Sequence, residues 1–546
     1  MSVISWRRGV LAAAASAWLA VGCVGEIGDG SPSLPPGLEG QAPTTAIPRL
    51  SRREIDATIE DVFGIAGAAE KYLPADPELA VNPVTKAEQE VFDTLSATKT
   101  PSQVFVDGLE SLAFAVARDF AADTAKVDAL AGCAPSSMAT GVSDPDCLRQ
   151  LVERAGLRLW RRPLTGVEIQ TLVDEAAPFA SDPAAGSQGH YVAARAAVAA
   201  LIVSPELVYR TEIGQPLGSG VVALDAYELI ARLAYFLWGT APSPELLAQA
   251  GSGALGDAAL EALVDDMLAD PRAETQMRTF HQLWLRYTRL LITDEAMAIA
   301  MRAESDALVD RALSPERWTE LFTATETYVT PELATHYGLP APSDSDWVAY
   351  DGERAGLLAH GSFLSLSQTK LTETLPSRRG AMIGRRLLCE VVRPPPPNVA
   401  ADMGVKVPAG SCKSDAYEAH ASGSCKGCHE LIDGIGFGFE RFDGQGRYRE
   451  IEAENTSCSI EGQGIAAGQA FSGPRAFSEA NLEQITSCAV THLLQFAVRD
   501  WTLSDAWLDR LGTTFRDAHH DFRSLVRAVA LDPAFRHRIQ IAGEAP

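Results

Sequence analysis

The chain has 546 residues, 46% of them hydrophobic, which is enough for three or more domains with ordinary cores. Its net charge of −25 argues against nucleic-acid binding, which requires a basic surface, so we expect no nucleic-acid partner. The acidic residues are spread along the whole chain, a pattern typical of solubility rather than of one binding segment.

The N-terminal segment has the features of an export signal. Arg7 and Arg8 precede a short apolar run, residues 9–20, which is too short to span a membrane. A small residue stands directly before Cys23, so residues 1–22 resemble a lipoprotein signal peptide with Cys23 as the lipidated residue. We therefore expect a lipid-anchored protein in the periplasm, or at the outer membrane or cell surface. An ordinary signal peptide with a later cleavage site is the alternative.

Helix signals dominate the rest of the chain, after a Gly-, Pro- and Ser-rich segment, residues 23–47, that is predicted to be a flexible tether. Good N-terminal capping residues precede apolar residues at helical spacing: Ser51 with Glu54, Thr165 with Glu168, Asp225 ahead of residues 226–238, and Ser243 with Pro244. Alternating strand patterns are scarce, and residues 327–330 and 462–472 are the best places for short strands. The sequence therefore predicts a mainly α fold.

The pentapeptide at residues 425–429, Cys-Lys-Gly-Cys-His, is a C-x-x-C-H motif, the signature of c-type haem attachment. Two thiols three residues apart on a helical turn can form thioethers with both vinyl groups of one porphyrin, and the adjacent imidazole then becomes the proximal iron ligand. The motif predicts covalent haem c bound through Cys425, Cys428 and His429. Two alternatives stay open: a tetrahedral zinc site that adds Cys412, and a redox-active dithiol.

The second axial ligand of the iron is not fixed by the motif. No Met follows His429, which excludes the common arrangement with a downstream Met ligand. The candidates are His420 and Met403 upstream and His492 downstream, and an open or water-bound iron is the further alternative. Either a Met or a His ligand fits electron transfer, whereas an open iron would permit peroxide or small-ligand chemistry.

The cysteine count fits an oxidising compartment. Without Cys23, Cys425 and Cys428, six of the nine cysteines remain, which is an even number and allows three disulfides. The neighbouring pairs are Cys133 with Cys147, Cys389 with Cys412, and Cys458 with Cys488, although the connectivity stays open.

No distal acid–base group is identifiable from the sequence, although carboxylates lie near the motif. Asp433, Glu440 and Asp443 are predicted to cap turns and to pair with Arg441 or Arg447. The chain has no P-loop, no G-x-G-x-x-G fingerprint after a strand, no H-E-x-x-H helix and no G-x-S-x-G elbow.

Several segments, in a fixed order, resemble the planctomycete-type cytochrome-associated proteins, which are strings of domains of unknown function with one C-x-x-C-H. The segments are residues 48–54 with 61–64, 159–165 with 203–210, 227–233 with 235–238, 378–380 with the four prolines at 394–397, and the haem motif with 435–443. The family often has Met-Asp-Pro after the motif, whereas this chain has Ile432, Asp433 and Gly434.

The resemblance implies a mainly α, multi-domain protein of helical bundles with a small cytochrome c-like haem-binding region. It places helical domains at residues 48–130, 146–215, 222–345 and 468–541, and the haem-binding domain at residues 350–450. We expect an electron-transfer protein that works outside the cytoplasm with a redox partner protein or an envelope component. The alternatives are an envelope- or polysaccharide-binding interaction protein with an auxiliary haem, and a peroxidase-like haem enzyme.

Overall fold

The computed structural model describes residues 38, 42–43, 47–81, 88–95, 101–136, 141–182, 188–218, 220–253, 255–290, 292–370, 373–392, 405–420 and 425–540. These residues are mainly helical and contain only two- and three-stranded antiparallel sheets, which confirms the predicted fold class. None of the helices in this part of the chain is long and apolar enough to cross a membrane. The predicted signal peptide, Cys23, most of the tether, Met403 and the four prolines lie outside the described residues.

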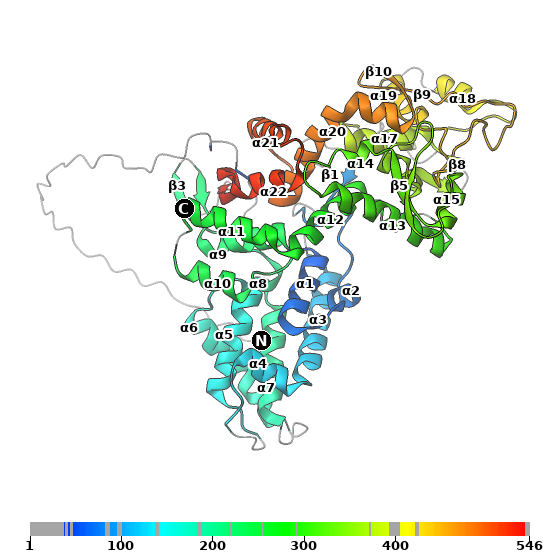
Figure 1. Ribbon diagram of the computed structural model, residues 1–546. Helices are drawn as coiled ribbons and strands as arrows, with labels where there is room; N and C mark the ends of the chain where they lie inside the picture. Colours follow the sequence, from blue (N-terminus) through cyan, green and yellow to red (C-terminus); the bar gives the residue numbers. More distant parts are fainter. Residues whose placement is uncertain are drawn as a thin grey trace, which may run out of the picture.

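The first part of the chain forms a helical lobe around one apolar core (Figure 1). Its helices are α1 (Arg52–Phe63), α2 (Ala68–Tyr72), α3 (Gln103–Ala121), α4 (Thr124–Ala131), α5 (Pro145–Trp160), α6 (Gly166–Ala176), α7 (Gly189–Val203) and α8 (Pro205–Val208). A small hairpin, β1 (Leu79–Val81) with β2 (Glu88–Glu90), follows α2. Both predicted capping boxes are confirmed, at Ser51 of α1 and Thr165 of α6.

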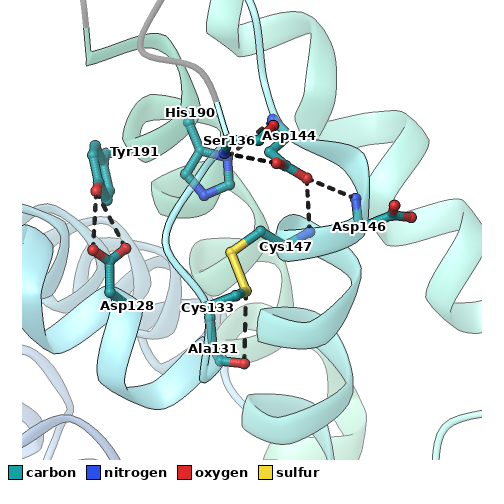
Figure 2. Close-up of a disulfide and its surroundings, with 9 residues drawn as sticks. All are labelled: Asp128, Ala131, Cys133, Ser136, Asp144, Asp146, Cys147, His190 and Tyr191. Atoms are coloured by element: carbon teal, nitrogen blue, oxygen red, sulfur yellow. Dashed lines mark hydrogen bonds between the residues drawn. A yellow bond between two sulfur atoms is a disulfide. The ribbon is translucent and has the colours of Figure 1, made fainter.

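A disulfide between Cys133 and Cys147 joins the end of α4 to the first turn of α5 (Figure 2). Asp144 caps α5, because its carboxylate accepts hydrogen bonds from the backbone N–H groups of Asp146 and Cys147. Hydrogen bonding to Ser136, together with these backbone bonds, holds the pKa of Asp144 well below its usual range. The predicted pairing of Cys133 with Cys147 is confirmed.

The second part of the chain packs around a larger apolar core that extends to the C-terminus. Its helices are α9 (Ala226–Leu237), α10 (Pro244–Gly251), α11 (Asp257–Ala269), α12 (Pro271–Leu285), α13 (Glu295–Ala312), α14 (Glu320–Thr323), α15 (Pro331–Tyr337), α16 (Gly361–Leu364), α17 (Pro376–Leu387), α18 (Lys413–His420), α19 (Lys426–Phe437), α20 (Gly473–Val498), α21 (Asp505–Asp517) and α22 (Phe522–Leu531). The helices beginning after Asp225 and Ser243 are α9 and α10, as predicted.

Short antiparallel sheets connect these helices. They are β3 (Gln215–Gly218) with β4 (Val221–Ala223) and β11 (His537–Ile539), β5 (Glu326–Val329) with β6 (Asp346–Ala349), β7 (Gln368–Lys370) with β8 (Glu373–Thr374), and β9 (Gln463–Ala466) with β10 (Gln469–Ser472). Strands β5, β9 and β10 confirm the two places where the sequence predicted strands. The pairing of β11 with β4 returns the C-terminal segment to the start of this second part (Figure 1).

Buried ion pairs join the two parts of the chain. The Glu212 carboxylate lies between two guanidiniums, with Nε of Arg210 at 2.7 Å and Nε of Arg232 at 3.1 Å. Arg232 also donates to the backbone carbonyls of Phe535 at 2.6 Å and His537 at 3.1 Å. Since the three charged side chains are at most 2% exposed, the single carboxylate compensates two cations that water does not reach.

We predict that Glu212→Gln destabilises the protein by about 3–5 kcal/mol, because it removes the charge of the carboxylate that both buried guanidiniums contact. The measurement is the thermal unfolding midpoint followed by circular dichroism. The control is Asp265→Asn, which breaks the exposed pair with Arg527 and should cost at most about 1 kcal/mol. Equal shifts in the two variants would contradict the role given to Glu212.

Candidate functional site

The C-x-x-C-H motif forms the first turn of α19, with Cys425 at its N-cap. Cys425 is half-buried, Cys428 is exposed, and neither is in a disulfide. Every other cysteine in the part of the chain that the structure describes is bridged. Two unbridged thiols thus lie one helical turn apart at the start of a helix, with His429 directly after them.

The other two disulfides connect segments that are distant in the sequence. Cys389 pairs with Cys488, and Cys412 pairs with Cys458, so the neighbouring pairings of these four cysteines are wrong. Packing explains the difference, because the end of α17 lies against α20. Cys412, the fourth ligand of the zinc alternative, is therefore engaged in a disulfide.

The imidazole of His429 is oriented by a carboxylate on its own helix. His429 Nδ1 lies 3.0 Å from Oδ2 of Asp433, one turn further along α19. Ser377, on α17, donates to the other oxygen of Asp433, and its Oγ lies 3.4 Å from His429 Nδ1. The side chains of His429 and Asp433 are only 20% and 9% exposed. A carboxylate acceptor at Nδ1 favours the tautomer protonated there, so a metal would be bound through Nε2.

The contact between α17 and α19 is what brings these three residues together. A Cβ on Gly380 of α17 would overlap the backbone oxygen of Ile432, and a Cβ on Gly436 of α19 would overlap that of Pro376. The two helices therefore approach closely enough for Ser377 to reach the side chains of the next helix. Sequence reasoning treated Asp433 as a turn residue and did not consider Ser377.

A second cluster of charged residues surrounds Glu440, which follows the end of α19. Its carboxylate accepts from Oγ1 of Thr374 at 2.6 Å, Nη2 of Arg449 at 3.0 Å, Nζ of Lys413 at 3.3 Å and Nη1 of Arg379 at 3.4 Å. Glu440 is 3% exposed and Arg379 is fully buried. The predicted pairing of Glu440 with Arg441 or Arg447 is wrong, because its cations are Arg449, Lys413 of α18 and Arg379 of α17.

Asp443 behaves as predicted. Its carboxylate accepts the backbone N–H groups of Gln445 and Arg447 and forms an ion pair with Nε of Arg447 at 2.8 Å. Arg441 instead pairs with Glu353. The turn after α19 is thus stabilised by local contacts, and the carboxylates of Glu440 and Asp443 both have structural partners.

The structure does not bring His492 to His429. The His492 ring packs against Phe92 and Trp284, with centroids 5.9 and 5.8 Å away, and its Nε2 is 3.8 Å from Sγ of Cys389. Burial lowers the pKa of His492 to about 4. Cys389 is at the far end of α17 from Ser377, and twelve helical residues span about 18 Å.

Of the two upstream candidates for the distal position, His420 is the last residue of α18, and its side chain is outside the described residues. Met403 is also outside them. Within the described residues, one further group has metal-ligand chemistry: Cys389, Cys488 and His492. Its two sulfurs are joined in a disulfide, so they supply no thiolate.

A buried cluster formed by α13, β5, α15 and the residue before α16 has the residue types of a hydrolase triad. Ser305 Oγ is 2.9 Å from His360 Nδ1, and His360 Nε2 is 3.5 Å from Oε1 of Glu304. Thr327 and Tyr337 donate to the Glu304 carboxylate at 2.6 and 2.8 Å. Ser305, His360 and Glu304 are 0% exposed, so no substrate reaches the serine. The cluster is a sealed polar network that holds the two regions together.

We predict a specific pH dependence of stability from this cluster. Burial raises the pKa of Glu304 from 4.5 to about 8, so between these values the folded protein keeps a proton that the unfolded chain has lost. The free energy of unfolding should therefore fall as pH rises through the upper part of that window, above about pH 6.5, where the buried His360, whose pKa is lowered to about 3, no longer contributes the opposite slope. The decline should be smaller in Glu304→Gln, measured as thermal midpoints across the window. Parallel pH profiles for the two proteins would contradict this assignment.

We predict that Gly436→Ala forces α17 and α19 apart and costs at least about 1–3 kcal/mol, the usual penalty for overpacking. The matched control is Gly427→Ala, on the same helix, where a Cβ meets nothing within 4 Å. That change should be neutral or stabilising, since Ala favours helix over Gly by up to about 1 kcal/mol. Thermal unfolding followed by circular dichroism, with limited proteolysis of the motif region, measures the difference. Equal stability of the two variants would contradict the close contact.

Three family models match the chain, each described as a protein of unknown function. They are DUF1595 over residues 147–212, DUF1592 over residues 224–339 and DUF1588 over residues 354–452. The last match contains the C-x-x-C-H motif. No curated protein and no solved structure matches the chain. The chain therefore carries the set of domains typical of planctomycete cytochrome c-associated multi-domain proteins.

Proposed function

We propose that the protein is a c-type haem protein that transfers electrons outside the cytoplasm, with haem c bound through Cys425, Cys428 and His429. The observation that carries the proposal is the start of α19, where two unbridged thiols precede an imidazole whose Nδ1 is hydrogen-bonded to Asp433. This donor set fits the group, since it offers two thioether positions and one oriented nitrogen ligand. When bound, haem supplies reversible one-electron chemistry.

The residues around the motif have distinct tasks in this proposal. Asp433 and Ser377 hold the His429 ring, and the close contact of α17 with α19 fixes their mutual position. Cys428 is exposed, so a group attached there lies at the protein surface. Surface attachment suits exchange of electrons with a partner protein or an envelope component.

The proposed location outside the cytoplasm is supported by the cysteine chemistry of the chain. Six cysteines form three disulfides, and such bonds persist in exported proteins. In this proposal, residues 1–22 direct export and a lipid on Cys23 anchors the protein to the membrane.

One structural observation favours haem over the zinc alternative for the motif. A zinc site needs a fourth ligand, and Cys412, which would supply it, is bonded to Cys458. Two unbridged sulfurs are also what a reduced dithiol has, so the test below decides between haem and the dithiol alternative.

The test is the absorption spectrum and intact mass of the exported full-length protein, produced with a cytochrome c maturation system. We expect a sharp α-band on reduction with dithionite and a mass gain of one haem, because the thioethers are covalent. Both should disappear in the double variant Cys425→Ala, Cys428→Ala. The double variant Cys133→Ala, Cys147→Ala is the control, since it removes the same number of cysteines from the first lobe and should keep the haem.

Correctly exported protein without covalent haem would overturn the proposal. Metal analysis of that protein would then identify a zinc site, and thiol titration would identify a dithiol.

A further inference from the structure

We propose that Asp433, held by Ser377, is a positioning residue that lowers the reduction potential of the group bound by His429. This inference rests on the proposed function and deepens it. It assigns to the carboxylate after the motif a role in setting the electron-donating strength of the proximal imidazole.

The geometry gives Asp433 two independent contacts in the site. One carboxylate oxygen is 3.0 Å from Nδ1 of His429, at the i,i+4 position where side chains share a helix face. The other oxygen accepts from the hydroxyl of Ser377, which comes from the neighbouring helix α17. The carboxylate is therefore anchored from a second element, unlike an exposed i,i+4 pair that is free to separate.

The surroundings of Asp433 keep its charge effective. Its side chain is 9% exposed, so water screens it weakly. No lysine or arginine forms an ion pair with it among the residues that the structure describes. This distinguishes it from Glu440 and Asp443, whose charges are compensated by Arg379, Lys413, Arg449 and Arg447.

The physical consequence follows from the acceptor's charge. A hydrogen bond to an ionised acceptor is roughly twice as strong as one to a neutral acceptor. It shifts electron density onto the imidazole and raises the basicity of the ligating nitrogen. A more basic ligand stabilises the more positive iron, so the oxidised state is favoured and the potential falls.

The experiment measures the reduction potential of the haem-loaded, full-length protein by spectroelectrochemistry. We expect Asp433→Asn to raise the equilibrium constant for reduction of the haem at least tenfold. For a one-electron couple this raises the reduction potential by about 59 mV. Ser377→Ala should shift the potential in the same direction by less, because it removes only the second anchor. Asp433→Glu keeps an ionised acceptor and should restore part of the lower potential.

The matched control is Glu430→Gln, which removes the same charge from the exposed residue directly after His429. Its shift should be clearly smaller than that of Asp433→Asn. Equal shifts would mean that net charge alone acts, and they would overturn the inference.

The outcomes separate this inference from the proposed function. An unchanged potential in Asp433→Asn with one covalent haem overturns the role of Asp433 and leaves the electron-transfer proposal standing. If Asp433→Asn does not mature, Ser377→Ala decides, and a wild-type potential in that variant overturns the inference. Wild-type protein without haem overturns both.

Discussion

The close contact of α17 with α19 is the constraint on which the candidate site depends. Neither Gly380 nor Gly436 has room for a methyl group, because the backbone oxygens of Ile432 and Pro376 occupy that space. Glycine has an entropic cost inside a helix of roughly 0.5–1 kcal/mol relative to alanine, which the close approach offsets by dense packing. Because the helices are so close, even the short side chain of Ser377 can bridge them and fix the Asp433 carboxylate that holds His429.

Buried ion pairs, in addition to this helix contact, fix the relative positions of the elements. In a strongly acidic chain, the buried cations Arg379, Arg232 and Arg210 each lie beside a single glutamate, either Glu440 or Glu212. The guanidiniums of Arg379 and Arg232 also donate to backbone carbonyls of distant segments, so these pairs fix the register between elements as well as compensating charge. The C-terminal helices take part, since Arg499 at the end of α20 pairs with Glu54 of α1 at 2.5 Å. The motif-bearing helix is thus attached to a rigid scaffold that includes both ends of the described chain.

Local signals in the sequence predicted local structure well. The capping boxes at Ser51 and Thr165 were predictable because side chain and backbone partners are three residues apart. Disulfide connectivity was not, because Cys389 and Cys488 meet only after α17 packs on α20. Asp433 carried a usable signal, since a His and an Asp four residues apart share a helix face. Ser377 carried none, because its role depends on how a second helix crosses the first.

The distribution of titrating groups bears on the kind of chemistry the protein performs. Functional proton transfer requires perturbed groups that a substrate can reach. Here the pKa of Glu304 is raised to about 8 by burial, and those of His281 and His360 are lowered to about 4 and about 3, but all three side chains are fully enclosed. Nε2 of His281 accepts from the Trp318 indole, which is a structural role. The accessible chemistry is instead concentrated at the start of α19, in an exposed thiol and an imidazole held by a carboxylate. If haem is bound there as proposed, electrons can be exchanged at this surface without proton transfer through the core.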